Sequence, residues 1–372
     1  MSEIEKIKAG LRKKAEPREV NFKALTKDMY LSSGSTLLNL ACTDRAVGAF
    51  VKGTYSLFVG DSDSGKTFFV LSILAEAAKN PNFDNYRFIF DCPEQGALMD
   101  IEKFFGSKAA KRIEPPRKDK KGDPIYSQTV EDFYYHVDDA LEEEVPFIYI
   151  LDSQDSLSSK AEGDAFQKNK KFSRRSRGDS DAKIAGSYGD SKAKLHSANL
   201  RRIIGLLKQT GSILIIVNQT RDAFNSLFEK STYSGGKALK FYSCYQVWSS
   251  QKGKIKKRVK GKDRQLGIKC KLQVKKNRVT GKDRIVYTNI FHSVGIDDLG
   301  SMISYLVEEG VWKCSENVIT ATGIGPEFSA KLESLIKKIY DDDLEEDVRD
   351  LVVNTWNEIE SGCTVERKKR YE

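Results

Sequence analysis

The segment 60–67 constrains this chain most, because its sequence Gly-Asp-Ser-Asp-Ser-Gly-Lys-Thr follows the spacing GxxxxGK[ST]. It lies between an apolar run at Tyr55–Val59 and a helix-like run at Phe68–Ala78, the strand–loop–helix context that this motif requires. Its glycines let the backbone curl so that N–H groups face phosphate oxygens. The alternative is a chance turn rich in glycine and serine, which the flanking runs disfavour. The sequence therefore predicts an ATP-binding loop made of Gly60, Asp61, Ser62, Asp63, Ser64, Gly65, Lys66 and Thr67.

Two residues of this loop have specific expected roles. The motif predicts that Lys66 reaches the β- and γ-phosphates of ATP and that the Thr67 hydroxyl ligates Mg²⁺. A site of this kind also needs a carboxylate at the end of a neighbouring strand, and Asp152 directly follows the apolar run Phe147–Leu151. An aspartate in that position is often only a turn former. With the phosphate loop upstream, we predict Thr67 and Asp152 as the metal site.

Hydrolysis also requires a group that positions or activates water near the γ-phosphate. Asp91 and Glu94 both follow the strand-like run Arg87–Phe90, and we expect Glu94 to be the base while Asp91 caps the turn. A simple loop role for both acids is the alternative. Gln219 follows the apolar run Ser212–Val217, where its amide could sense the γ-phosphate. The predicted catalytic residues are Lys66, Glu94 and Gln219.

Strand-like and helix-like runs alternate through the middle of the chain, which is typical of βαβ units. We therefore expect an α/β fold with a mostly parallel sheet and helices on both faces. The later runs Tyr245–Ser249, Leu266–Val274 and Arg284–Phe291 are strand-like, and segments rich in lysine and glycine separate them. They predict an antiparallel extension of the same sheet.

Two segments have an unusual charge. Residues 160–194 contain ten Lys/Arg against five Asp/Glu and show no apolar periodicity, which predicts a mobile basic loop. Residues 251–284 contain fifteen Lys/Arg against Asp263 and Asp283 alone. The whole chain has a formal charge of +9, so an anionic partner such as nucleic acid is favoured.

Between 220 and 235, aromatic and basic residues alternate. Rings can stack on bases while cations follow a phosphate backbone, so this pattern indicates a contact with single-stranded nucleic acid. An ordinary surface loop is the alternative. We predict as DNA-binding residues Arg174, Arg175, Arg177, Arg221, Phe228, Lys230, Tyr233 and Lys237.

The six cysteines form no CxxC pair, so neither a zinc ribbon nor a disulfide framework is indicated. The first residues carry charges where a signal peptide needs an apolar stretch, and no run approaches the length of a membrane span. We therefore expect a cytoplasmic protein without a membrane partner, located in the host cytoplasm if the chain is viral.

Together these motifs resemble the RecA recombinases and, among them, the phage UvsX-like members. The resemblance covers residues 31–312, and several motifs occur in the order and spacing of the family. They are Leu31-Ser-Ser-Gly-Ser, the ATP-binding loop, Leu151-Asp-Ser, Gly189-Asp-Ser, Val217-Asn-Gln, Ser234-Gly-Gly-Lys-Ala-Leu-Lys-Phe-Tyr and Lys276-Asn-Arg. A long basic first loop and a helical C-terminal region without a terminal acidic tail favour a viral or divergent member.

The resemblance implies a DNA-dependent ATPase that forms helical filaments on single-stranded DNA and pairs it with a homologous duplex. Single-strand-binding and mediator proteins would be further partners. It implies a segment at 1–30 that packs on the adjacent subunit, an ATPase core at 31–320 and a small helical region with a basic tail at 321–372. Its two DNA-binding loops would lie near 158–188 and 220–235.

Lys276 and Arg278 end a strand within the most basic segment. The resemblance implies that they act across the subunit interface, on the γ-phosphate of a neighbour, whereas the residues alone also allow plain DNA-facing charge.

Two other functions share parts of this pattern. A hexameric replicative helicase has the same type of ATPase core, although we expect such a helicase to carry a large helical domain before it. A catalytically weak DNA-binding or mediator protein is the other alternative. Lys66, Thr67 and Asp152 disfavour it, because a pure binding protein does not need groups that handle metal and phosphate.

Overall fold

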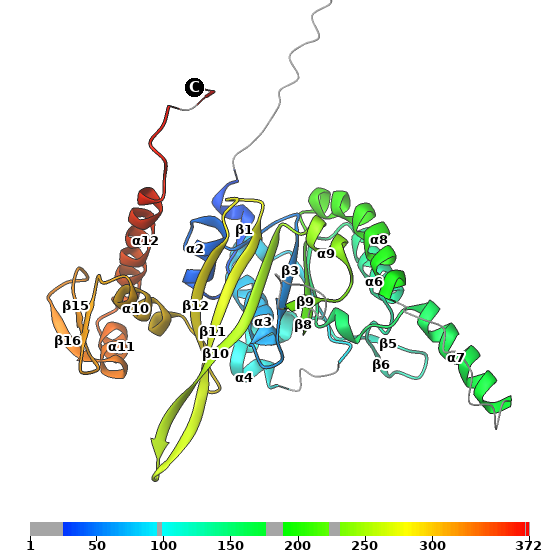
Figure 1. Cartoon of the computed structure of the whole chain (residues 1–372), viewed down its shortest axis with the longest axis horizontal. Helices are drawn as coiled ribbons and strands as arrows, with labels where there is room; N and C mark the ends of the chain where they lie inside the picture. Colours follow the sequence, from blue (N-terminus) through cyan, green and yellow to red (C-terminus); the bar gives the residue numbers. More distant parts are fainter. Residues whose placement is uncertain (1–24, 95–98, 176–188, 223–230, 369, 372) are drawn as a thin grey trace, which may run out of the picture.

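A computed structural model of the chain describes residues 25–94, 99–175, 189–222, 231–368 and 370–371. Figure 1 shows one large sheet with helices on both sides, a two-stranded arm that projects from it, and a small C-terminal region. We expect the segment 1–30 to have a role in self-association. Its residues 1–24 lie outside the described residues. No helix in the described ranges is long and apolar enough to cross a membrane.

The large sheet has nine strands, eight of them in the order β13-β12-β11-β10-β3-β8-β7-β4, while β9 pairs with β8. Neighbours from β10 to β4 are parallel, and β11, β12 and β13 continue the sheet in antiparallel pairing. The mostly parallel sheet and its antiparallel extension are thus confirmed. Because parallel strands end at the same edge, the segments that follow β3, β4, β7 and β8 meet there.

The strands of this sheet are β3 (Tyr55–Gly60), β4 (Arg87–Asp91), β7 (Phe147–Leu151), β8 (Ile213–Asp222), β9 (Ser231–Tyr233), β10 (Tyr245–Val259), β11 (Lys262–Asn277), β12 (Arg284–Phe291) and β13 (Gly295–Asp297). The helices around it are α2 (Thr36–Thr43), α3 (Lys66–Lys79), α4 (Ile101–Phe105), α5 (Ser107–Arg112), α6 (Val130–Glu142), α7 (Lys160–Arg175), α8 (Gly189–Thr210), α9 (Lys237–Tyr242) and α10 (Asp298–Glu308). Two small strand pairs, β1 (Tyr30–Leu31) with β2 (Phe50–Val51) and β5 (Arg117–Lys118) with β6 (Pro124–Ile125), lie outside it. Short 3-10 turns are η1 (Lys27–Met29), η2 (Pro81–Phe83) and η3 (Gln154–Ser156).

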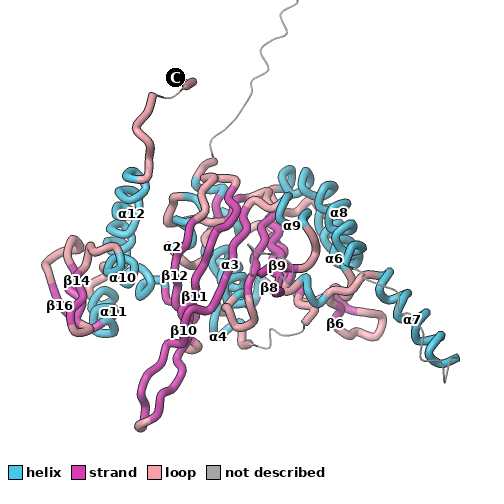
Figure 2. The backbone as a smooth tube through the Cα atoms, viewed as in Figure 1, coloured by secondary structure: helices cyan, strands magenta, loops and turns pink. Residues whose placement is uncertain are grey.

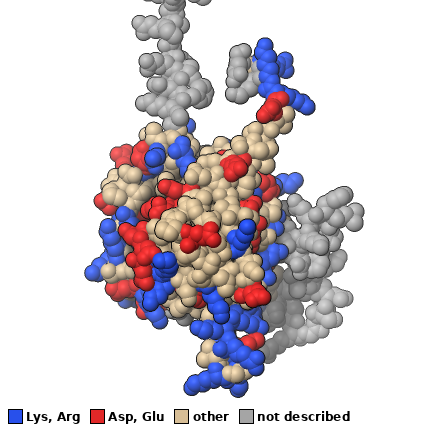
Figure 3. Space-filling model, turned by 90° about the vertical axis from the view of Figure 1, so that its left-hand side faces the viewer, with Lys and Arg blue, Asp and Glu red and all other residues tan. Residues whose placement is uncertain are grey.

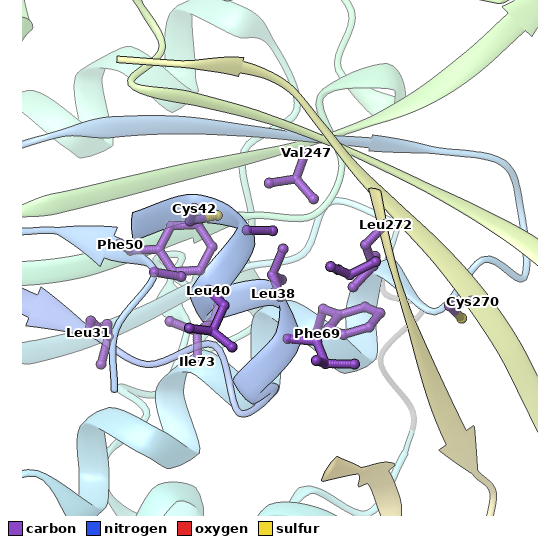
Figure 4. Close-up of a cluster of buried hydrophobic side chains, with 14 of the residues drawn as sticks. Leu31, Leu38, Leu40, Cys42, Phe50, Phe69, Ile73, Val247, Cys270 and Leu272 are labelled. Carbon is purple, nitrogen blue, oxygen red and sulfur yellow. The ribbon is translucent and has the colours of Figure 1, made fainter. Parts of the chain in front are cut away.

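Each central strand is buried on both faces. In β8, for example, Ile215 belongs to the core on the α2 and α3 side, whereas Ile216 belongs to the core on the α6 and α8 side. Figure 4 shows part of the first core, where Phe69 of α3 and Leu38 of α2 lie near Val247 of the sheet. Helices on both faces are therefore confirmed. They hold the strands rigidly, so the edge where the strands end can position side chains accurately.

The C-terminal region combines helices with a small sheet. It contains β14 (Lys313–Ser315), β15 (Val318–Ala321), β16 (Phe328–Lys331), α11 (Leu332–Asp341) and α12 (Glu345–Gly362). The three strands are antiparallel, and the sequence pattern did not indicate them. On the core side, Arg284 forms ion pairs with Asp44 at 2.6 Å and with Glu360 of α12 at 2.8 Å. Trp356 donates to the same Asp44 carboxylate, so α12 is fastened to the end of α2.

The prediction of an irregular loop over the whole of residues 160–194 is wrong. α7 covers Lys160–Arg175, and α8 already begins at Gly189. Figure 2 shows α7 as a helix that extends away from the sheet. Polar and charged residues dominate α7, and a helix with so little apolar surface lacks the periodic pattern by which helices are recognised in a sequence.

His196 of α8 gives the fold a pH-dependent stability. It is fully buried, and its Nδ1 lies 2.8 Å from the Tyr134 hydroxyl. Burial, aided by the charge on Lys192, lowers the pKa of His196 from 6.5 to about 3. The folded protein therefore keeps this ring neutral at a pH where the unfolded chain binds a proton. Its contribution to stability is complete above pH 6.5 and is lost as the pH falls towards 3.

We expect the free energy of unfolding to fall by about 2 kcal/mol between neutral pH and about pH 5 through this ring alone. Urea unfolding of the wild type and of His196→Gln at both pH values measures the contribution. Glutamine can still accept from Tyr134 but does not titrate, so the variant should lose less stability on acidification. An equal loss in both proteins would show that other groups cause the acid sensitivity.

Candidate functional site

The predicted ATP-binding loop joins the end of β3 to the start of α3. At Gly60 a Cβ atom would overlap the backbone oxygen of Ser249 on β10. Gly65 has φ of 82° and precedes the first residue of α3, and a Cβ there would also collide with Ile290. Only glycine fits such close packing at both positions. The first turn of α3 thus leaves its backbone N–H groups directed towards the loop, as phosphate binding requires.

Lys66 lies almost buried inside this loop. Its ammonium donates to the backbone oxygen of Asp61 at 2.6 Å. Burial lowers its pKa, while the carboxylates of Asp152, Asp61 and Glu94 act in the opposite direction. Among the described residues, this cation is hydrogen-bonded to one loop carbonyl, which a phosphate oxygen could replace, and acids surround it. Such a cation fits a triphosphate.

Thr67 and Asp152 meet at the same edge. The Thr67 hydroxyl donates to Oδ2 of Asp152 at 2.7 Å, because α3 starts next to the end of β7. Burial raises the pKa of Asp152, and the hydrogen bond from Thr67 opposes this shift. In the described ranges no cluster of three or more His, Cys, Asp or Glu side chains could hold a metal alone. One hydroxyl and one carboxylate nevertheless suit Mg²⁺, which keeps several waters and is otherwise held by phosphate.

Glu94 lies beside this pair. Its Oε1 accepts hydrogen bonds from Ser153 and Ser156, both at 2.6 Å, and from the side-chain amide of Gln219 at 3.2 Å. Burial would raise the pKa of Glu94, but the two serine hydroxyls and the charge on Lys66 outweigh it and lower the pKa. The carboxylate is therefore ionised, as a base or water-positioning group must be.

Asp91 has a different environment. It is 5% exposed and accepts from the Ser127 hydroxyl at 2.5 Å and from the Tyr149 hydroxyl at 2.7 Å, with His136 nearby. Burial alone would raise its pKa, but these hydrogen bonds lower it. Its oxygens are thus occupied by structural partners away from Lys66. Asp91 is the last residue of β4 and Glu94 follows it, and the structure brings only Glu94 to the predicted ATP-binding loop.

Gln219 belongs to a network that links this site to the following segment. Its backbone N–H donates to Asp155 at 2.5 Å, and the other oxygen of Asp155 accepts from the Ser234 hydroxyl at 2.6 Å. Next to Gln219, Asn218 donates to the backbone oxygen of Ser234 at 2.9 Å. Both ends of the 220–235 segment are therefore tied to the edge that carries Glu94. Asp155 was not among the predicted residues, because its hydrogen-bond partners lie more than 60 positions away and nothing local marks it.

The predicted DNA-binding residues lie in several places. Arg174 and Arg175 end α7, Arg221 is in β8, and Lys237 is the exposed first residue of α9, whereas Arg177, Phe228 and Lys230 lie outside the described residues. Tyr233 of β9 packs edge-to-face on Trp248, with ring centroids 6.0 Å apart. On the same Trp248 ring lies the ammonium of Lys275, at 3.6 Å from the centroid. Trp248 and Lys275 were not among the predicted residues, although a tryptophan within a basic strand is a usable signal.

Lys276 and Arg278 lie away from their own ATP-binding loop. Lys276 pairs with Gln246 of β10, which in turn pairs with Leu57 near the start of β3. Both cations donate to the backbone oxygen of Phe241 at the end of α9, at 2.8 and 2.5 Å. Burial, with the neighbouring Arg278, lowers the pKa of Lys276 to about 8. The described contacts therefore place neither cation on the phosphate site of the same chain.

A family model described as the RecA N-terminal domain matches residues 176–297, which include the strands β8 to β13. The core is RecA-like. The chain is 28% identical over 294 residues to Protein RecA of Chlorobaculum parvum, which covers 76% of this chain and 71% of that protein. With Protein RecA of Corynebacterium jeikeium it shares 29% identity over 302 residues, covering 79% and 68%. With Protein RecA of Chlorobaculum tepidum it shares 27% over 298 residues, covering 77% and 72%. This RecA-like core carries the predicted ATP-binding loop, Glu94 and Gln219 on one edge.

Proposed function

We propose that this chain is an ATP-dependent recombinase that forms filaments on single-stranded DNA and promotes pairing and strand exchange with a homologous duplex. The similarity to RecA proteins supports the class. The observation that carries the proposal is the hydrogen bond between Glu94 and Gln219, because it joins a water-positioning acid to the base of the segment 220–235.

ATP with Mg²⁺ supplies a γ-phosphoryl group whose transfer to water drives the cycle. Lys66 would neutralise the charge that develops on the β- and γ-phosphates, and Thr67 with Asp152 would hold Mg²⁺. Glu94, ionised and fixed by Ser153 and Ser156, orients the attacking water and accepts its proton. Gln219 reports the state of the phosphate to β9.

Single-stranded DNA is expected to contact the segment 220–235. Tyr233 offers a ring for stacking, and Lys237 with the missed Lys275 offers positive charge close to it. Since Asp155 and Ser234 connect this surface to the end of β7, a change at Glu94 alters the same hydrogen-bond network. ATP and DNA binding would therefore be coupled through residues that are already in contact.

Lys276 and Arg278 support assembly into a filament. Since neither reaches the phosphate site of its own chain in the described contacts, the arginine-finger role requires a neighbouring subunit. If each subunit supplies these cations to the next one, the subunits are arranged head to tail. Such heterologous contacts generate a closed ring or an open helix. Segment 1–30 would add a second contact.

Electron microscopy with single-stranded DNA and a non-hydrolysable ATP analogue tests the recombinase against the helicase. We expect open helical filaments whose length follows that of the DNA. Closed rings of uniform size would show that the chain is a helicase of the same core type.

We expect Gln219→Ala to remove the coupling between ATP and DNA. The variant should still bind ATP through Lys66 and Thr67, and should still bind DNA weakly through long-range charge. The wild type should bind single-stranded DNA about 5–150-fold more tightly with the ATP analogue than without it, and the variant should lose most of this factor. Titrations of a fluorescent oligonucleotide with and without the analogue measure both affinities.

Asn218→Ala is a matched control on the neighbouring position, since its amide binds the backbone oxygen of Ser234 rather than Glu94. It should weaken DNA binding with and without the analogue by similar factors. An unchanged affinity ratio in Gln219→Ala would show that coupling follows another path.

Within the recombinases, we propose a phage UvsX-like subtype. The basic α7 segment and the helices α11 and α12 support this subtype, since they lie in the long basic first loop and the helical C-terminal region that favour a viral or divergent member.

A further inference from the structure

The peptide group between Ser64 and Gly65, inside the predicted ATP-binding loop, is held by two side chains of the large sheet. The Ser249 hydroxyl of β10 donates to the backbone oxygen of Ser64 at 2.6 Å. The Cys270 thiol of β11 donates to the same oxygen at 3.4 Å. Burial raises the pKa of Cys270 to about 12, so the thiol keeps the proton that it donates. One carbonyl of the loop therefore accepts hydrogen bonds from two neighbouring strands.

The pairing of β10 with β11 explains why the two donors converge. Ser249 pairs with Leu272, and Cys270 comes two residues before Leu272, so Ser249 and Cys270 are diagonal neighbours on one face. On its other side Ser249 pairs with Gly60 of β3, and its backbone oxygen lies so close that a Cβ on Gly60 would overlap it. Ser249 thus contacts both the first residue of the loop and the peptide group near its end.

The two donors lie at buried positions. Ser249 is 2% exposed and Cys270 is fully buried. Beyond them the strands leave the sheet as an arm, residues 251–266, and the pairing continues to Val259 and Lys262, where the sequence pattern predicted a turn. Figure 3 shows the exposed cations of this arm as the blue cluster at the lower end of the molecule. Apolar side chains are the usual choice at buried strand positions, so two donors that meet at one loop carbonyl need an explanation.

A fixed carbonyl also fixes the N–H group on the other side of the same peptide bond. A peptide group is planar, and this one is trans, so its C=O and N–H point in opposite directions. Because the Ser64 oxygen points towards β10 and β11, the N–H of Gly65 points away from these strands. Gly65 directly precedes Lys66, the first residue of α3. Backbone N–H groups at this place are the ones that a loop of this type directs at phosphates.

The opposite orientation of this peptide group would disfavour phosphate. A rotated peptide would present the Ser64 oxygen to the phosphate oxygens, and their negative charges would repel each other. Gly65 makes such a rotation easy, because glycine adopts positive and negative φ with similar ease. Close packing nevertheless requires glycine at this position. The loop therefore needs a restraint on the peptide 64–65 that comes from outside its own backbone.

We propose that Ser249 and Cys270 are positioning residues for ATP, which hold the peptide group between Ser64 and Gly65 in the orientation that binds phosphate. They act through the loop and not on the nucleotide itself. The proposal rests on the proposed function in one respect, that residues 60–67 bind ATP. It adds to that site two residues from strands that the loop motif does not include.

Nucleotide binding to the full chain tests the proposal. The variants are Ser249→Ala, Cys270→Ala and the double variant, and the probes are a non-hydrolysable ATP analogue, ADP and adenosine. Competition against a fluorescent nucleotide measures the three affinities. Adenosine has no phosphate, so it reports on the rest of the site. Ser250→Ala is the matched control, because successive side chains of a strand point to opposite faces.

We expect Ser249→Ala to bind the ATP analogue and ADP about 2–10-fold more weakly, the range that one neutral hydrogen bond represents. The double variant should lose more, whereas Cys270→Ser, which keeps a donor, should stay within about twofold of the wild type. Adenosine should bind all variants equally well. At saturating ATP the hydrolysis rate of Ser249→Ala should stay within about twofold of the wild type, because the loop holds the phosphates equally before and during transfer. A purely structural role would instead lower this rate through loss of folded protein.

Unchanged affinity for ADP in the double variant would overturn the proposal, and so would an equal loss for adenosine or an equal loss in Ser250→Ala. Ser249→Ala removes a single oxygen atom, so it keeps the test decisive if the double variant unfolds. Failure of the proposed function gives a different result. If the variants behaved as expected and the wild type showed no DNA-stimulated ATPase, the recombinase would be refuted and the role of Ser249 and Cys270 would stand.

Discussion

Lys66→Ala is expected to lower the rate of ATP hydrolysis by at least about 10²–10³-fold. The ammonium is the only cation that the described residues place within the loop, where it donates to Asp61 and faces Asp152 and Glu94. Without it, the charge that develops during phosphoryl transfer is no longer compensated. Steady-state release of phosphate with saturating single-stranded DNA measures the effect.

Lys79→Ala is the matched control, because this exposed lysine ends the same helix α3. Its hydrolysis rate should equal that of the wild type. Near-normal turnover in Lys66→Ala would refute the assignment of the ATP-binding loop, provided that both variants unfold at the same temperature as the wild type.

Glu94→Gln is expected to keep ATP binding and to lose hydrolysis by about 10²–10⁴-fold. Glutamine can still accept from Ser153 and Ser156, so the loop should keep its shape, but it cannot take a proton from water. Binding of a fluorescent nucleotide analogue and single-turnover hydrolysis separate the two steps.

Asp91→Asn provides the comparison, because Asp91 ends the strand β4 that Glu94 follows. The amide would lose part of the hydrogen bonding with Ser127 and Tyr149, and we expect a stability loss of about 1–3 kcal/mol with turnover retained in the folded protein. If Asp91→Asn abolished hydrolysis and Glu94→Gln did not, the base would be Asp91.

Much of the fold and the position of the candidate site could be predicted because their signals are local. The ATP-binding loop follows from its spacing, and Asp152 from its position after a buried strand. Parallel strands then bring such strand ends together without any further information, as the contact between Thr67 and Asp152 shows.

The features that escaped prediction depend on long-range contacts or on unusual charge. Glu94 was predicted as the base from the sequence, but the partners that hold Asp91, on β7 and near α6, could not be predicted because they are distant in the chain. α7 and residues 251–266, the arm formed by β10 and β11, were interpreted as loop and turn because charged residues dominate them. In the arm, backbone pairing continues from a rigid sheet, so the ladder forms although no apolar face supports it.

The root and the tip of the arm differ in the space that they leave for an added side chain or label. At the root, a Cβ on Gly267 would collide with the backbone of Ile290, so no side chain is tolerated there. At the tip, a Cβ on Gly261 would meet no atom within 4 Å. A fluorophore or an affinity tag inserted between Lys260 and Gly261 would therefore leave the core untouched. From that position it would report changes at a point about 30 Å from the edge that carries the predicted ATP-binding loop.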